Sequence, residues 1–170
     1  IASRTEDFGM ITPRYLLPFD STRAVHRFAD VLVIGGGLAG LRAANAVEPN
    51  QSVLVVTKDQ LRESNSVYAQ GGIAGVLDPD DCFESHVADT LAAGGNLCDQ
   101  TIVDMVIRDG PRRIEELIRW GTKFDQNNGE ISLGREGGHS RERIVHARGD
   151  ATGQEVMRAV IERTRERSNI

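Results

Sequence analysis

The feature that most constrains the fold is the glycine-rich turn GGGLAG, which follows the apolar run DVLVI. Gly35, Gly37 and Gly40 give it the pattern G-x-G-x-x-G. Between a strand and a helix, the first glycine permits a tight turn, the second lets the backbone approach a pyrophosphate, and the third allows close helix packing. Phosphates then bind at the positive helix end, where N–H groups point outward. The alternative is a glycine turn without a ligand.

The residues on either side of this turn supply the strand and the helix that the pattern requires. The β-branched run at 30–34 predicts a buried parallel strand, and a helix is expected over 38–47. Pro49 ends that helix, and 52–56 predicts a second buried strand. The sequence therefore predicts an α/β fold that begins with a strand, a glycine turn, a helix and a parallel strand.

A long loop and further helices are expected after this unit. Residues 60–75 are polar and rich in glycine, and loops of this length are often functional. Helical patterns follow at 83–93 and at 100–108, and Asp99 is a plausible N-cap for the second of them. The central part of the chain is therefore predicted to be a functional loop followed by helices.

Two further helix starts are indicated by local signals. Pro111 with Gly121 beyond it predicts a separate helix at 111–120, because proline favours the first turn and glycine the end of a helix. The stretch TGQE at 152–155 has the pattern of a capping box. It would open a last helix with an apolar side formed by Val156, Val160 and Ile161.

Composition excludes several classes of partner. The chain has 170 residues, 39% of them hydrophobic and 26% charged, with a net charge of -5, which is ordinary for one globular domain. Without a basic stripe or an apolar run of about 18 residues, we expect neither a nucleic-acid nor a membrane partner. Cys82 and Cys98 lack CxxC spacing, so we predict buried structural thiols and no metal site. Residues 1–28 show no periodicity and are predicted to be an irregular extension.

The end of the second strand bears on which dinucleotide binds. A nicotinamide dinucleotide usually meets an Asp or Glu there, which accepts hydrogen bonds from the ribose hydroxyls. Thr57 and Lys58 occupy that place instead, although Asp59 could substitute. Lys58 either neutralises a phosphate or is a solvated surface lysine. These residues weaken the prediction of a simple NAD dehydrogenase.

Several motifs, in order, resemble a known family. DVLVIGGGLAGLRAA, VVTKD, SNSVYAQGGIAGV and LGREGGHSRERIVHARGDATGQEV are similar to the L-aspartate oxidase family, within the superfamily of succinate dehydrogenase and fumarate reductase flavoproteins. The resemblance runs from about Asp30 to the end of the chain. It implies a Rossmann-like FAD-binding domain, a parallel sheet with flanking helices, of which residues 29–170 form an incomplete, N-terminal part.

The resemblance implies noncovalent FAD, with the pyrophosphate at residues 36–39, Lys58 near the adenosine and residues 65–72 around the flavin. In that loop, Ser66 and Gln70 can hydrogen-bond to ring heteroatoms, and glycines let backbone amides approach a flat ligand. The candidate cofactor-binding residues are Gly35, Gly36, Gly37, Leu38, Ala39, Gly40, Lys58, Asn65, Ser66, Val67, Tyr68, Ala69, Gln70, Gly71 and Gly72.

Asn65 distinguishes between relatives. Succinate dehydrogenases and respiratory fumarate reductases carry a histidine at this place that bonds covalently to the flavin, and asparagine cannot form that bond. The aspartate oxidase family more commonly has serine here. The residue is therefore consistent with noncovalent FAD and leaves its own hydrogen bond open.

The segment at 133–150 combines many charges with glycines, so it is either a solvated loop or part of a site. The resemblance makes Glu136 the substrate-orienting catalytic residue, which accepts a hydrogen bond from the α-amino group of aspartate. Arg135, Arg141 and Arg143 are candidates to clamp a carboxylate, although at least two are expected to be exposed or paired with Glu142 and Asp150. His139 and His146 are more simply satisfied loop histidines.

The resemblance implies oxidation of L-aspartate to iminoaspartate, with oxygen or fumarate as acceptor, in the quinolinate route to NAD. Quinolinate synthase would be a partner, and a cytoplasmic location is expected. Two alternatives are a soluble fumarate reductase and a non-catalytic dinucleotide-binding module. Because the family's enzymes are longer, we expect this chain to be an N-terminal portion that is inactive alone.

Overall fold

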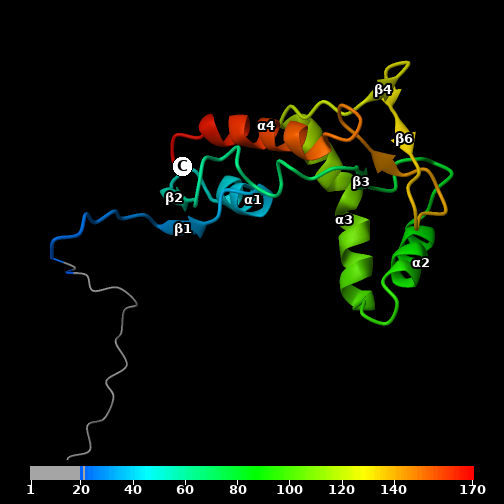
Figure 1. The fold of residues 1–170 in the computed structure, drawn as a ribbon, viewed down its shortest axis with the longest axis horizontal. Coiled ribbons are helices and arrows are strands. Elements are labelled where there is room, and N and C mark those ends of the chain that lie inside the picture. Colours follow the sequence, from blue (N-terminus) through cyan, green and yellow to red (C-terminus); the bar gives the residue numbers. More distant parts are fainter. Residues whose placement is uncertain (1–19, 21) are drawn as a thin grey trace, which may run out of the picture.

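The computed structural model describes residue 20 and residues 22–170 (Figure 1). The predicted extension over 1–28 lies largely outside the described residues. The elements, in chain order, are β1 (Val31–Ile34), α1 (Leu38–Ala46), β2 (Val53–Val56), β3 (Ile73–Ala74), α2 (Phe83–Ala93), α3 (Gln100–Arg119), β4 (Gln126–Asn127), β5 (Glu130–Ile131), β6 (Leu133–Gly134), β7 (Ile144–Val145) and α4 (Thr152–Arg165).

The predicted unit at the start of the fold is confirmed. Strands β1 and β2 are parallel, with Val31 opposite Val53 and Ile34 opposite Val56. Helix α1 connects them, and its Leu41 and Ala44 are fully buried. Since α1 also packs against α4, the helix that follows the glycine turn lies between the small sheet and the last helix (Figure 1).

A second, antiparallel sheet joins distant parts of the chain. Its strand order is β3, β7, β6, so β7 lies in the middle and both of its residues are buried. Ile73 pairs with Val145, and Leu133 also pairs with Val145. The sheet therefore brings the end of the loop before β3 next to both ends of the charged segment at 133–150.

The hydrophobic core lies mainly under α4. Val156, Met157, Val160 and Ile161 form its buried side, as the apolar spacing of this helix predicts. They pack with residues from α1, α3, β7 and the stretch after α3, namely Leu41, Ile114, Phe124, Val145 and Ala147. Helix α4 thus carries the contacts that connect the two sheets.

The prediction of two helices at 100–108 and 111–120 is wrong, because a single helix α3 runs through Pro111. Proline removes one backbone hydrogen bond, which costs up to about 3 kcal/mol in a helix interior. Ile107 and Ile114, two turns apart on the same side, are both buried. Their packing on either side of the proline stabilises the continuous helix. The predicted N-cap is confirmed: Asp99 accepts hydrogen bonds from the N–H groups of Thr101 and Ile102.

The last helix begins where predicted, but without a capping box. Its N-cap is Ala151, which makes no side-chain bond. The Thr152 hydroxyl instead accepts a hydrogen bond from the Ala147 N–H at 3.0 Å, and the Glu155 carboxylate accepts one from the Lys123 N–H. Both side chains are buried, so they satisfy backbone groups of neighbouring segments instead of their own helix end.

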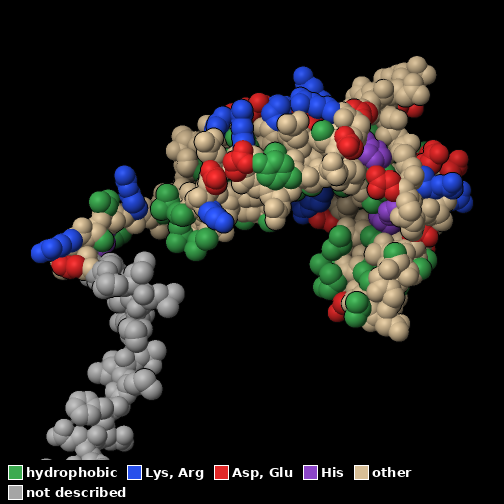
Figure 2. Space-filling model, in the orientation of Figure 1, with side chains coloured by type: hydrophobic (Ala, Val, Ile, Leu, Met, Phe, Trp, Pro, Cys, Tyr) green, Lys and Arg blue, Asp and Glu red, His purple; other side chains and the backbone are tan. Residues whose placement is uncertain are grey.

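Exposed apolar side chains include two groups on regular elements, one on β1 and β2 and one on α3. Ile34 is 83% exposed and Val56 46%, although strands of a parallel sheet are normally covered on both faces. Met105 and Val106 are exposed on the N-terminal half of α3. Figure 2 shows such side chains gathered over β1 and β2 and along the arm formed by α2 and α3. The described residues therefore leave part of the sheet face and of this arm uncovered.

Neither cysteine is fully buried. Cys82 is exposed and Cys98 is partly buried, and both are free thiols, so the prediction of two buried thiols is wrong. Within the described part of the chain, no helix has both the length and the apolar character needed to cross a bilayer.

Candidate functional site

The glycine turn has the geometry that pyrophosphate binding requires. Gly35 has a φ of +122°, a conformation that side chains disfavour, and its N–H donates to the Val56 carbonyl at 2.8 Å. A Cβ added to Gly40 would lie 2.0 Å from the Gly35 carbonyl oxygen. Helix α1 begins after Gly37 and has no acidic side chain in its first turn. An anion can therefore approach this helix end without repulsion.

The predicted flavin loop is fixed against two helices. The Ser66 hydroxyl accepts a hydrogen bond from the Leu38 N–H at 3.1 Å, at the start of α1. The Gly153 N–H, at the start of α4, donates to the Ala69 carbonyl at 3.1 Å. Since a Cβ on Gly153 would lie 2.3 Å from the Ser66 carbonyl oxygen, the loop packs directly on the α4 backbone. Ser66 thus contacts the phosphate end of the site, and its predicted bond to the flavin ring stays a prediction.

Other candidate cofactor residues divide into exposed and packed groups. Lys58, Asn65 and Gln70 are exposed, so their polar groups are accessible to a ligand. Val67 packs against the hydrophobic core, and Tyr68 donates a hydrogen bond to Glu63. The polar candidates and Tyr68 are therefore exposed, while Val67 packs the loop against the core.

These residues fit FAD. The glycine turn gives a pyrophosphate access to the first turn of α1, and the exposed Lys58 offers a cation after β2. Gly71, with a φ of +74°, adopts a conformation that favours glycine and presents backbone at the end of the loop. Bound there, FAD would supply the hydride acceptor, which no amino-acid side chain provides.

Next to this loop, Glu136 lines a hollow of about 420 Å³. Its Oε1 lies 2.8 Å from His146 Nε2, and a Cβ added to Gly71 would lie 3.5 Å from the same oxygen. The other lining residues are Asp125, Ser132, Leu133, Gly134, Gly149 and Asp150. The structure therefore brings Glu136, His146 and Gly71 together, as the β3–β7–β6 sheet requires.

Arg143, one of the three candidate carboxylate clamps, does not line this hollow and belongs to the paired arginines that the sequence analysis also expected. Its side chain is fully buried. Nε and Nη2 each donate to the Asp81 carboxylate at 2.8 Å, and Nη1 donates to Asp89 at 2.7 Å. The predicted partners Glu142 and Asp150 are thus replaced by two aspartates around α2. Arg143 is a structural anchor, because its donors are used within the protein.

Asp89 connects the same anchor to the charged loop. Its carboxylate accepts hydrogen bonds from the N–H and the hydroxyl of Ser140, both at 2.8 Å. The Ser140 N–H, the Ser140 hydroxyl and the Arg143 guanidinium lower the pKa of Asp89 to about 2, against the opposing effect of burial. The loop is therefore attached to α2 by a carboxylate that is ionised at neutral pH.

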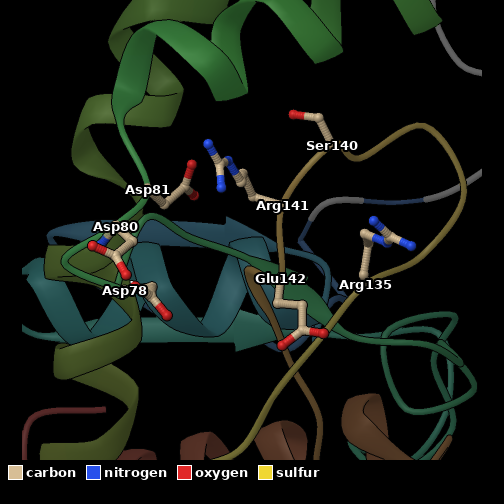
Figure 3. Close-up of a pocket in the computed structure, with 7 residues that line it drawn as sticks. All are labelled: Asp78, Asp80, Asp81, Arg135, Ser140, Arg141 and Glu142. Atoms are coloured by element: carbon tan, nitrogen blue, oxygen red, sulfur yellow. Dashed lines mark hydrogen bonds between the residues drawn. The ribbon is translucent and has the colours of Figure 1, made fainter.

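Arg135 and Arg141 are exposed and line a different hollow, of about 290 Å³ (Figure 3). Asp78, Asp80 and Asp81 face them from the segment before α2, and Arg141 extends toward Asp81 in that view. In the described part of the chain, neither arginine lines the hollow of Glu136. The structure therefore separates the candidate arginines from the candidate substrate residue.

The two candidate histidines also separate. The His139 ring lies 5.5 Å from the His86 ring, on the side of the loop that faces α2. Burial, followed by the positive charge of Arg143 and by His139, lowers the pKa of His86. Sequence reasoning missed His86, Asp81 and Asp89, which lack a local motif and meet the loop more than 50 residues later in the chain. Among the described residues, no cluster of three or more His, Cys, Asp or Glu side chains could hold a metal ion.

The fold and the glycine turn define the class of protein. The family model described as "FAD binding domain" matches residues 30–170, and the chain belongs to this family. Several curated relatives are named L-aspartate oxidase. That of Mycobacterium tuberculosis is 53% identical over 136 residues, and the chloroplastic one of Arabidopsis thaliana is 51% identical over 137 residues.

The alignments cover most of this chain but only a small part of each relative. The alignments cover 78% and 80% of this chain, but only 26% and 21% of the two relatives, so the chain spans about a quarter of their length. Solved structures agree with the fold. The FrdA chain of an E. coli quinol fumarate reductase has a TM-score of 0.79 at 33% identity, covering 84% of this chain and 25% of that one. The Mycobacterium smegmatis Sdh1 has a TM-score of 0.73 at 36% identity, covering 79% and 23%. Together these matches confirm the predicted family resemblance and the predicted FAD cofactor.

Proposed function

We propose that the protein carrying this chain oxidises L-aspartate to iminoaspartate with FAD, with oxygen or fumarate as electron acceptor. The observation that carries the proposal is the position of Glu136, whose carboxylate lies beside Gly71 at the end of the flavin loop. Relatives named L-aspartate oxidase, about half identical over this chain, support the same substrate. The product would enter the quinolinate route to NAD.

The residues of this chain have distinct roles in that reaction. The glycine turn and the first turn of α1 bind the pyrophosphate, and the loop at 65–72 surrounds the flavin. Glu136 would accept a hydrogen bond from the α-amino group of aspartate and so orient the α-carbon, and FAD, when bound, would supply the hydride acceptor. Because succinate lacks the amine, this contact favours aspartate. Arg143 is committed to Asp81 and Asp89, so other cations bind the two substrate carboxylates.

A soluble fumarate reductase is the second candidate, and the similarity to the E. coli quinol fumarate reductase favours it. Asn65 fits noncovalent flavin in both candidates. The two differ in whether the substrate carries an amine, so Glu136 is the residue that separates them. A non-catalytic dinucleotide-binding module is a further alternative, in which no dicarboxylate would reduce the flavin.

The decisive experiment mixes the full-length flavoprotein with L-aspartate or with succinate under anaerobic conditions. Bleaching of the flavin absorbance by aspartate is expected, and bleaching by succinate alone would overturn the assignment. Glu136→Gln should reduce aspartate oxidation more than fumarate reduction, because only aspartate presents an amine. Equal losses in both reactions would argue against the role of Glu136.

Quinolinate synthase is the expected partner, since it would consume the product. A cytoplasmic location is expected, although the plant relatives named chloroplastic make a plastid the alternative that a localisation experiment must test. The 170 residues alone should bind FAD poorly and lack oxidase activity, because they correspond to only about a quarter of the length of the relatives named L-aspartate oxidase. Tight, stoichiometric flavin on the isolated chain would contradict this.

A further inference from the structure

Glu136 occupies a position that does not fix its side chain. It stands on the loop between β6 and β7, followed by two glycines, and the second of these, Gly138, has a φ of +86°. Its side chain is 47% exposed. Such a side chain would lose rotamer freedom, at a cost of about 1 kcal/mol or more, when it orients a substrate. A second group is therefore needed to hold the carboxylate.

His146 is that second group. Its Nε2 lies 2.8 Å from Glu136 Oε1, and its side chain is 25% exposed, half the fraction of its partner. Within the described part of the chain, this is the one hydrogen bond that the Glu136 carboxylate makes, and it uses Oε1. Oε2 is thus left to accept a hydrogen bond from a ligand.

The imidazole of His146 lies between two glycines. A Cβ added to Gly72 would lie 3.0 Å from Cδ2 of the ring, and a Cβ added to Gly134 would lie 3.1 Å from Cε1. The backbone is fixed as well, because the His146 carbonyl accepts a hydrogen bond from the Asp125 N–H at 2.8 Å. Glycines at both positions therefore form a slot that fits the ring and connects it to the end of the flavin loop.

A second acidic side chain that lines the hollow is already used. Asp125, which also lines the hollow, accepts hydrogen bonds from the N–H groups of Arg148 and Gly149 at 2.9 and 3.0 Å. Those bonds hold Arg148 at a φ of +54°, which shapes the turn after His146. Asp125 thus organises the backbone, and Glu136 is the carboxylate that the histidine can orient.

We propose that His146 is a positioning residue for substrate recognition: it holds Oε1 of Glu136 so that Oε2 faces the amine of an amino dicarboxylate next to the flavin. The inference rests on the proposed function and deepens it. It assigns amine selectivity to a pair of residues instead of one. His146 acts through Glu136 and need not touch the substrate.

The test uses the full-length holoprotein with its flavin chemically reduced under anaerobic conditions, where aspartate cannot be oxidised. Calorimetry then measures the dissociation constants of L-aspartate and of succinate. His146→Leu should weaken aspartate binding by about tenfold, because the aspartate amine loses its hydrogen bond to a correctly oriented Glu136 carboxylate. Succinate has no amine, so its binding should change by less than about threefold. His146→Gln, which keeps an N–H donor, should restore aspartate affinity to within about threefold.

Two controls separate positioning from folding. His139→Leu makes the same change in the same loop, at a ring that packs on His86, and should leave the aspartate-to-succinate ratio unchanged. In a Glu136→Gln background, His146→Leu should change aspartate affinity by less than about twofold, because the two residues act as a unit. Equal weakening of both ligands by His146→Leu, or failure of glutamine to rescue, would overturn the inference.

The outcomes also separate this inference from the proposed function. If the unchanged protein binds aspartate no more tightly than succinate, the proposed function fails and the inference fails with it. If the unchanged protein prefers aspartate, and Glu136→Gln removes that preference while His146→Leu preserves it, only the positioning role of His146 is refuted.

Discussion

Two regions of the molecule build a site in opposite ways. The glycine turn (residues 35–40) lies between β1 and α1 and acts through its backbone: Gly35 has a φ of +122°, and Gly40 packs against the Gly35 carbonyl oxygen. The arginine-anchored loop (residues 134–146) depends on side chains: Arg143 reaches Asp81 and Asp89, 62 and 54 positions earlier in the chain. The first region is specified locally, and the second by contacts between distant segments.

The largest effect should follow from breaking the anchor of the second region. Arg143→Met leaves the carboxylates of Asp81 and Asp89 without their cation, so we expect a loss of about 3–5 kcal/mol in the free energy of unfolding. Urea denaturation of the full-length protein measures it. Arg141→Met, at an exposed arginine of the same loop, should change stability by less than about 0.5 kcal/mol. Similar losses of unfolding free energy in the two variants would show that the buried ion pairs of Arg143 stabilise the protein no more than an exposed arginine does.

Adding a methyl group at Gly40 tests whether the glycine turn depends on close backbone contact. Gly40→Ala places a Cβ 2.0 Å from the Gly35 carbonyl oxygen, so helix and strand must move apart, at a cost of about 1–3 kcal/mol and with weaker FAD binding. Thermal unfolding and flavin titration measure both effects. Gly110→Ala is the matched control inside α3, where the Cβ would meet the Ala74 carbonyl oxygen at 3.8 Å. It should stabilise the helix by about 0.5–1 kcal/mol, and destabilisation there would undermine the steric argument.

Acid should weaken the second region before it affects the first. Asp89 has a folded pKa of about 2, below its ordinary value of 3.8. Its contribution is therefore fully present above about pH 4 and is lost as the pH falls through about 2, and it amounts to about 2 kcal/mol. The difference in unfolding free energy between the wild type and Asp89→Asn should shrink over that range. A difference that stays constant from pH 6 to pH 2 would contradict the assignment.

The smallest effect concerns the bond between the flavin loop and the glycine turn. Ser66→Ala removes the acceptor of the Leu38 N–H, and we expect a loss of about 1 kcal/mol in unfolding free energy. Ser64→Ala is the matched control, because that hydroxyl accepts from Val67 at 3.3 Å within the same loop and should matter less. Equal losses of unfolding free energy would show that the hydrogen bond from Leu38 to Ser66 stabilises the protein no more than the hydrogen bond within the loop.

Local patterns predicted much of the fold. The strands beside the glycine turn, the helices α1 and α2, the Asp99 cap and the apolar side of α4 follow from residues within one or two turns of each other. Pro111 misled the prediction because burial of Ile107 and Ile114 stabilises the helix through it. Glu155 also misled it, since its carboxylate bonds to Lys123 and pairs with Arg158, outside any capping box.

The candidate site was predictable only in part. The cofactor turn could be inferred because its function depends on which residues lack a side chain, and that is visible in the sequence. The role of Arg143 could not be inferred, since its charge is equally suited to a substrate and to a buried aspartate. His146 had the same ambiguity, and its slot between Gly72 and Gly134 exists only once the three strands have paired.

By itself, the sequence determined that residues 30–56 form a dinucleotide-binding unit, because glycine spacing and strand periodicity act over a few residues, and the family resemblance implied that the dinucleotide is FAD. The tertiary structure alone decided which charges of the segment at 133–150 are buried in ion pairs and which line a hollow. Arg143 turns inward to two aspartates, while Glu136 lies in a hollow against His146. The physical reason is that a charge takes its role from its partners, and here those partners lie far away in the chain or across a sheet.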